Sequence, residues 1–195
     1  MRNALSIAFV LFAALVPARG DAFDNVRKGF LLGGSTGLGA QLYSSNRPNP
    51  PGSLSEAALA TSLRLGYGLD AMTEIYFFSG GVTSFQFYYI PLPYTSSVTG
   101  LGLRRYFSGS GSASRVFASV GAGVGSTSII LSWKDWGNGS GLGLMGGLGY
   151  EYRKHWSLEL EGDWANLAPV PPYDDPSTPI SSVTMIAVKI SGAAY

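Results

Sequence analysis

The sequence contains no cysteine, a single histidine and few charged residues. The absence of cysteine excludes a disulfide framework, a zinc–thiolate site and a thiol nucleophile. Charged residues make up 13% of the chain, about half of the roughly 25% that is usual in soluble domains. Basic and acidic residues are nearly balanced, at 13 and 12. The chain therefore lacks the basic excess of a nucleic-acid-binding protein, and we expect no nucleic acid among its partners.

Long apolar runs are scarce as well. The segment Ala4–Val16 follows Arg2 and is too short to span a bilayer, but it has the length of a signal-peptide core. Small residues at Gly20 and Ala22 predict cleavage after one of these two positions. We expect residues 1–20 to be removed and residues 21–195 to form one domain. A retained N-terminal anchor helix is the alternative, and no later segment predicts a transmembrane helix.

What the chain does have is 27 glycines and a period-2 alternation of side chains. In residues 58–69 and 116–125, one parity is apolar and the other is mostly glycine, serine and occasional charge. Successive side chains of a strand point to opposite faces, so each segment predicts a strand with one apolar and one small or polar face. A secreted chain with few charges can hide such apolar faces in lipid by closing into a barrel.

Eight such strands can be placed along the chain, with turn residues between them. Long connections are expected at 44–56, near 91–93, at 128–140 and at 165–181, and short ones at 70–72, 108–115 and 153–155. The third strand is expected to run from Thr73 to about Tyr89, with a bulge at Gly80–Gly81. Alternation of long and short connections is typical of outer-membrane barrels, whose periplasmic turns are the short ones.

These segments resemble the small eight-stranded outer-membrane barrels of the OmpA-like and OmpX-like group. The resemblance rests on patterns such as residues 62–67, 100–107 and 147–152, and it covers the whole mature chain. It implies an all-β, eight-stranded antiparallel up-and-down transmembrane barrel, with short periplasmic turns and four longer external loops. It also implies outer-membrane lipid and the barrel-assembly machinery as partners, but it says little about activity.

The C-terminus departs from this family pattern. Such barrels end in an aromatic residue that is in phase with alternating apolar residues, whereas Tyr195 shares its parity with Lys189 and Ser191. Two interpretations are open. A bulge at Ser191–Gly192 would restore the phase, or residues 192–195 form a frayed tail.

The glycine-rich parity also carries most of the charged residues of the predicted strands. Because buried charges are costly unless paired, we expect an ion-pair network across the lumen. Its predicted members are Arg64, Glu74, Arg104, Glu151, Glu159, Glu161, Asp163 and Lys189. One interpretation is a plug that fixes the barrel, since eight strands enclose just enough room for side chains. The other is a narrow gated path for ions, because inward glycines leave volume for water.

Aromatic residues gather toward the predicted external ends of the strands and in the loops. They include Tyr88, Tyr89, Tyr94, Trp133 and Trp136. Aromatic rings at this level commonly form an interfacial girdle. The alternative is a contact surface for a partner on the external loops.

His155, followed by Ser157, invites comparison with outer-membrane lipid A acyl-hydrolases, but it lies in a short predicted turn and no second histidine is present. We therefore predict no catalytic residue, no metal site and no cofactor. The expected function is that of an integral outer-membrane barrel with a structural or surface-interaction role. A narrow porin-like channel is the first alternative and a lipid-modifying enzyme the second. A soluble lipocalin-type barrel would need a charged exterior, which neither parity provides.

Overall fold

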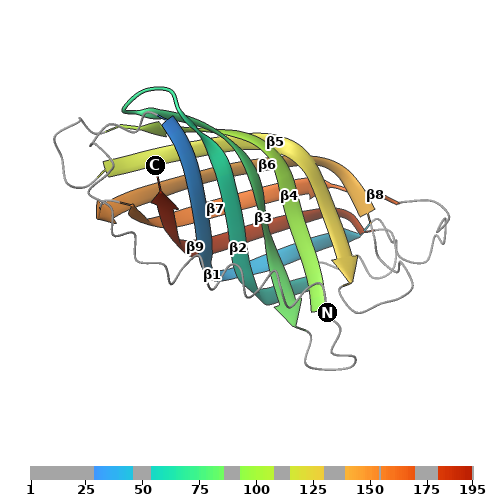
Figure 1. Ribbon diagram of the computed structural model, residues 1–195. Coiled ribbons are helices and arrows are strands. Elements are labelled where there is room, and N and C mark those ends of the chain that lie inside the picture. Colours follow the sequence, from blue (N-terminus) through green and yellow to red (C-terminus); the bar gives the residue numbers. More distant parts are fainter. Residues whose placement is uncertain are drawn as a thin grey trace, which may run out of the picture.

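The computed structural model describes residues 29–45, 54–85, 93–107, 115–129, 139–153, 155–169 and 180–194. They form a closed barrel of eight long antiparallel strands, inclined to the barrel axis (Figure 1). The long strands are β1 (Gly29–Ser45), β2 (Leu54–Gly68), β3 (Thr73–Phe85), β4 (Pro93–Tyr106), β5 (Arg115–Ile129), β6 (Gly139–Arg153), β7 (Trp156–Asn166) and β9 (Ile180–Ala194). A two-residue strand, β8 (Ala168–Pro169), pairs with the start of β6.

The barrel closes because β9 pairs with β1 and β5 pairs with β6, so no long strand keeps a free edge. Cα partners followed once around the wall lead from Gly33 on β1 back to β1 at Tyr43, ten residues further along. The path runs through Arg64, Phe78, Gly100, Gly123, Gly143, Ala165 and Val183. Such a stagger over eight strands corresponds to a strand tilt of about 40°.

Burial confirms the predicted orientation of the two faces. Leu38 and Leu101 are 75% and 72% exposed on the outside, whereas Lys189 is 1% exposed in the interior. The same alternation runs along every long strand. Exposed leucines around buried charges are the reverse of a soluble protein. This exterior is suited to hydrocarbon, where the closed ladder also pairs the backbone groups of neighbouring strands.

Two predicted irregularities are absent from the described strands. The pairing of β3 with β2 and β4 runs without a register shift across Gly80–Gly81, so the predicted bulge there is wrong. The pairing of β9 with β1 is regular from Val183 to Ala194, which rules out both a bulge at Ser191–Gly192 and fraying over 192–194. The C-terminal end of β9 is also held by the turn between β6 and β7, because the Ala193 N–H donates to the His155 carbonyl at 3.0 Å.

The strands run further than the sequence predicts at one end of the barrel. Ala165 and Asn166 belong to β7, and Ala168–Pro169 pair with Gly139–Ser140, so the predicted loop 165–181 begins only after Pro169. The strands also extend into the predicted connections 44–56 and 128–140, since β1 ends at Ser45, β2 begins at Leu54, β5 ends at Ile129 and β6 begins at Gly139. The predicted continuation of the third strand over 86–89 lies outside the described residues. No helix among the described residues is long and apolar enough to cross a membrane.

We call this end, where β1 joins β2, the long-loop end. The opposite end, where β2 joins β3 and β6 joins β7, is the short-turn end. In the short turn after β2, the Met72 N–H donates to the Asp70 carboxylate at 2.6 Å and the Leu69 N–H to the Thr73 carbonyl at 2.9 Å. The long strands have 11 to 17 residues, and crossing a bilayer takes about 9–11.

Inward glycines in the short-turn half make room for aromatic rings. A Cβ on Gly149 would lie 2.1 Å from the Phe117 ring, and one on Gly102 would lie 2.6 Å from the Tyr76 ring. Gly121 stands in the same relation to Phe78, again at 2.6 Å. At these positions, ring atoms occupy the space that a water-filled channel would need, so the glycines here serve packing.

Candidate functional site

The lumen is the candidate functional site, because every charged side chain predicted there faces inward. The structure places Arg64, Glu74, Arg104, Glu151, Glu159, Asp163 and Lys189 among the buried residues, and the Glu161 side chain is 12% exposed. Arg115 is a further buried lumen residue. It is the first residue of β5 and not part of the predicted turn 108–115, and it shares the parity of Phe117 and Ser119, which is the signal that identifies it.

Glu159 on β7 binds two arginines at once. Its Oε1 accepts from Arg64 Nη2 at 3.1 Å, and its Oε2 accepts from Arg104 Nη2 at 2.9 Å. The Ser157 hydroxyl donates to Oε1 at 3.0 Å. Both carboxylate oxygens are therefore used, and the paired charges satisfy the condition under which ions tolerate burial. We call Arg64, Arg104 and Glu159 the Glu159 clamp.

The Glu159 clamp crosses the full width of the lumen. In the closed order of strands, β3 lies opposite β7, and Arg64 and Arg104 come from β2 and β4 on either side of β3. Arg104 also lies over the Phe117 ring, with 3.9 Å between its guanidinium carbon and the ring centroid. The corresponding distance from Arg64 to Tyr76 is 6.0 Å. Aromatic faces thus cover the sides of both cations.

A second ion pair lies nearer the middle of the barrel. Lys189 on β9 binds Glu161 on β7, and its Nζ donates to the Ser62 hydroxyl at 3.4 Å. Asp163 interacts electrostatically with both members of this pair. Among the described residues, its Oδ1 has no hydrogen-bond partner.

The remaining predicted members lie at the short-turn end. Glu74 interacts electrostatically with Arg64, and Glu151 is the Cα partner of Arg115 across β5 and β6. Arg115 Nη1 donates to the Ala71 carbonyl in the turn between β2 and β3 at 3.3 Å. Arg115 therefore links the short-turn end of the lumen to the turn between β2 and β3.

The long-loop half of the lumen is lined by small and apolar side chains. Ala60, Val82, Val98 and Met185 are at most 2% exposed and belong to one buried apolar cluster. Apart from Asp163, the described polar groups here are mainly hydroxyls and amides, such as the Ser96–Thr127 pair at 3.1 Å. Gln41 is fully buried, and neither of its amide atoms has a hydrogen-bond partner among the described residues.

Most residues of the predicted aromatic surface are not among those that the structure describes. Tyr88, Tyr89, Trp133 and Trp136 lie outside the described residues, and Tyr94 lies in β4 without a described side chain. At the opposite, short-turn end, the structure describes several exposed rings. They are Phe30, Tyr67, Tyr152 and Trp156 at strand ends and Phe107 directly after β4, whereas Phe77, Tyr150 and Trp164 are exposed elsewhere on the outer wall. Rings at this level are typical of a membrane–water interface.

His155 lies in the short turn between β6 and β7, as the sequence predicts. Its φ of 72° is in the left-handed region, which a non-glycine residue rarely adopts outside tight turns. Its backbone carbonyl accepts from the Ala193 N–H, which is a structural contact.

Comparison with known proteins identifies the fold. No family model and no curated protein matches the chain. Among solved structures, the surface protein NspA of Neisseria is similar over 87% of this chain and 99% of its own, with 12% identity and a TM-score of 0.55. The attachment invasion locus protein Ail of Yersinia pestis is similar over 86% and 99%, with 11% identity and a TM-score of 0.54. Both resemblances show the fold of the small outer-membrane barrels, in agreement with the family resemblance in the sequence.

Proposed function

We propose that this chain is an integral barrel of a bacterial outer membrane with a structural or surface-interaction role and a lumen closed by ion pairs. In this proposal, residues 1–20 are the signal peptide, the barrel-assembly machinery inserts the chain, and outer-membrane lipid surrounds it. The external loops make any contact with a surface partner. No catalytic residue takes part.

The Glu159 clamp carries the proposal. It joins three strands across the lumen, and its arginines are packed against Phe117 and Tyr76, so ions have no straight path along the axis at this level. The Lys189–Glu161 pair narrows the lumen again, nearer the middle of the barrel. Opening such a path would leave buried guanidinium groups without their carboxylate, which costs several kcal/mol.

A surface role is supported by the kind of protein that shares this fold. NspA is named a surface protein and Ail an attachment invasion locus protein. Fold alone does not transfer function, so this part of the proposal depends on the loops of this chain. The aromatic residues Tyr88, Tyr89, Tyr94, Trp133 and Trp136 are proposed as contact residues there.

The proposal is tested first by location and then by conductance. The full chain is expected to fractionate with outer membranes and to migrate faster on a gel before heating than after it. In planar bilayers the purified barrel is expected to give no single-channel steps, whereas Glu159→Gln, which breaks both ion pairs of the clamp, gives small ones. Asp163→Asn, outside the clamp, is the matched control and is expected to stay silent.

Regular steps from the unaltered barrel, changed in size by Arg104→Gln or Glu161→Gln, would establish the narrow channel in place of a closed lumen. A chain that is recovered without detergent would refute membrane insertion itself.

A further inference from the structure

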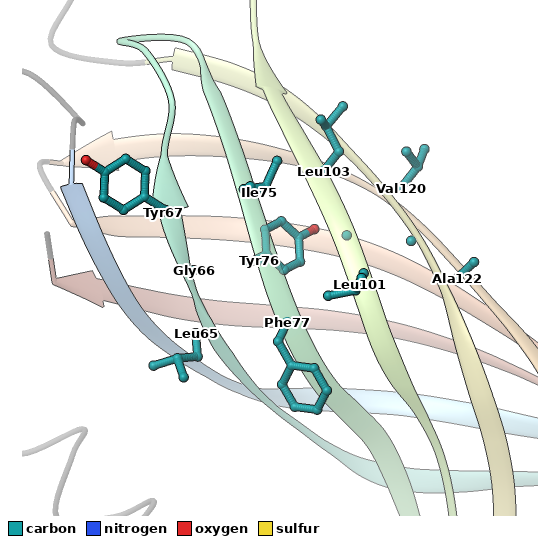
Figure 2. A pocket seen from close by; sticks show the side chains of 12 residues that line it. Leu65, Gly66, Tyr67, Ile75, Tyr76, Phe77, Leu101, Leu103, Val120 and Ala122 are labelled. Carbon is teal, nitrogen blue, oxygen red and sulfur yellow. The ribbon is translucent and has the colours of Figure 1, made fainter.

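The outer wall of the barrel carries a groove across β2, β3, β4 and β5 with a volume of about 710 Å³. Its two sides are rows of apolar side chains that are Cα partners from strand to strand. One row runs from Tyr67 through Leu103 to Val120, and the other from Leu65 through Leu101 to Ala122. Figure 2 shows both rows on neighbouring strands, with Phe77 in the second.

The floor of the groove is the strand backbone of the row between them, whose side-chain positions face the lumen. This row is Gly66, Tyr76, Gly102 and Gly121 in strand order, and the Tyr76 ring is buried inside the barrel. The groove starts at Tyr67, next to the short-turn end of β2, and ends at Ala122, the middle residue of β5. It therefore extends from one membrane boundary to about the midplane, which is the depth of one leaflet.

A pair of opposite charges stands at the boundary end of this groove. Arg105 is the next outward residue after Leu103 on β4, and Asp70 lies in the short turn after β2. Their side chains are 52% and 53% exposed, and Arg105 Nη1 lies 3.9 Å from Asp70 Oδ2. Arg105 also donates to the Thr73 hydroxyl of its Cα partner. The long ion-pair distance leaves both groups accessible to a ligand.

Asp70 is fixed as an anion by its own turn. The Met72 N–H donates to its carboxylate at 2.6 Å. This backbone hydrogen bond, with smaller contributions from Thr73 and Arg105, holds the pKa of the Asp70 carboxyl below its usual value. The groove thus ends in one fixed cation and one fixed anion, side by side at the level of lipid headgroups.

We propose that this groove binds a phospholipid of the leaflet at the short-turn end, with an acyl chain between the two apolar rows, its phosphate on Arg105 and a primary ammonium headgroup on Asp70. The inference rests on the proposed membrane insertion and adds a specific lipid to it. A planar guanidinium offers paired N–H donors to phosphate oxygens. A carboxylate accepts from the N–H groups of a primary ammonium, which a trimethylated headgroup does not have.

The test is native mass spectrometry of the full refolded barrel, released from detergent that contains one dioleoyl lipid at a time. The three lipids are phosphatidylethanolamine, phosphatidylcholine and phosphatidylglycerol, which share the phosphate and the acyl chains. The unaltered barrel is expected to retain one phosphatidylethanolamine about tenfold more than either other lipid, the value of one charge-assisted hydrogen bond.

The variants separate the three parts of the site. Arg105→Gln is expected to lower retention of all three lipids about tenfold, whereas Arg153→Gln, an exposed arginine at the same end on β6, leaves it unchanged. Asp70→Asn is expected to abolish the preference for the primary ammonium over phosphatidylcholine. Ala122→Phe fills the groove and lowers retention of every lipid, and Val188→Phe on the far wall does not.

Equal retention of the three lipids, or equal losses for Arg105→Gln and Arg153→Gln, would overturn the proposed site. Either result would mean that the barrel retains adventitious lipid only. A preference for phosphatidylglycerol would overturn the role of Asp70. Gel migration before and after heating is measured on every sample, so a barrel that folds and inserts but shows no preference refutes this inference and not membrane insertion.

Discussion

The two halves of the lumen are closed by different means. In the short-turn half, four cations and three carboxylates are buried together with large rings that rest on glycines. In the long-loop half, the described side chains are mostly alanine, valine, methionine and hydroxyl residues, with Asp163 as their charged member. Both halves contain side chains that are at most 2% exposed. Charge is therefore not needed to fill a barrel of this width, because small side chains suffice.

The difference lies in what each half specifies. The Glu159 clamp fixes which strands face each other, since one carboxylate must reach β2 and β4 simultaneously. Apolar packing in the long-loop half is less selective about its partners. Buried ion pairs add little net stability but are costly to break. The charged half is thus expected to be the more sensitive to single substitutions.

The largest effect is expected for Glu159→Gln. This substitution leaves Arg64 and Arg104 buried without their shared carboxylate, and it should lower the free energy of unfolding by about 3 kcal/mol. Urea unfolding of the barrel in lipid vesicles, followed by tryptophan fluorescence, measures this change. Asp163→Asn in the other half should change it by less than about 1 kcal/mol, because the attraction of the Asp163 carboxylate to Lys189 is opposed by its repulsion from Glu161. Equal losses for both variants would contradict a specific role for the clamp.

A smaller effect is expected where glycine supports a ring. The Cβ of Gly149→Ala would lie 2.1 Å from Phe117 and push the ring against Arg104, at a cost of about 2 kcal/mol. Gly146 lies on the same strand but faces outward, and a Cβ there meets nothing within 4 Å. Gly146→Ala should therefore be neutral or stabilise by about 0.5 kcal/mol. The same unfolding assay compares them, and a loss at Gly146 as large as at Gly149 would point to strand flexibility instead of ring packing.

The strand number, the orientation of the two faces and the inward position of all eight charged residues are predictable from the sequence. Period-2 alternation suffices for this, because in a closed wall surrounded by lipid the apolar face of each strand must point outward and the polar face inward. Alternation along one strand carries no information about partners across the lumen. That Glu159 rather than Glu161 binds two arginines depends on the ten-residue stagger of the barrel, which emerges only when all strands are paired.

Glycine shows the same limit of local reasoning. Gly80–Gly81 looks like a bulge in isolation, but the strand is regular there, while a register shift lies between Glu151 and Arg153 beside a short turn. In the channel interpretation inward glycines leave room for water, but Gly102 and Gly149 each lie under a ring from the neighbouring strand, and Gly121 lies under the Phe78 ring of β3, two strands away. What a glycine contributes to the barrel depends on which side chain the strand register places against it.

The smallest expected effect is a gain, in the long-loop half. Gln41 buries both amide atoms without a hydrogen-bond partner among the described residues, and Met is similar in length but has no unpaired polar atom. Gln41→Met should therefore raise the free energy of unfolding by about 1 kcal/mol. Thr127→Val, which removes the hydroxyl paired with Ser96, should lower it by a similar amount. If Gln41→Met were instead as damaging as Thr127→Val, the amide would have a partner such as a buried water, and the long-loop half would be wetter than its apolar lining indicates.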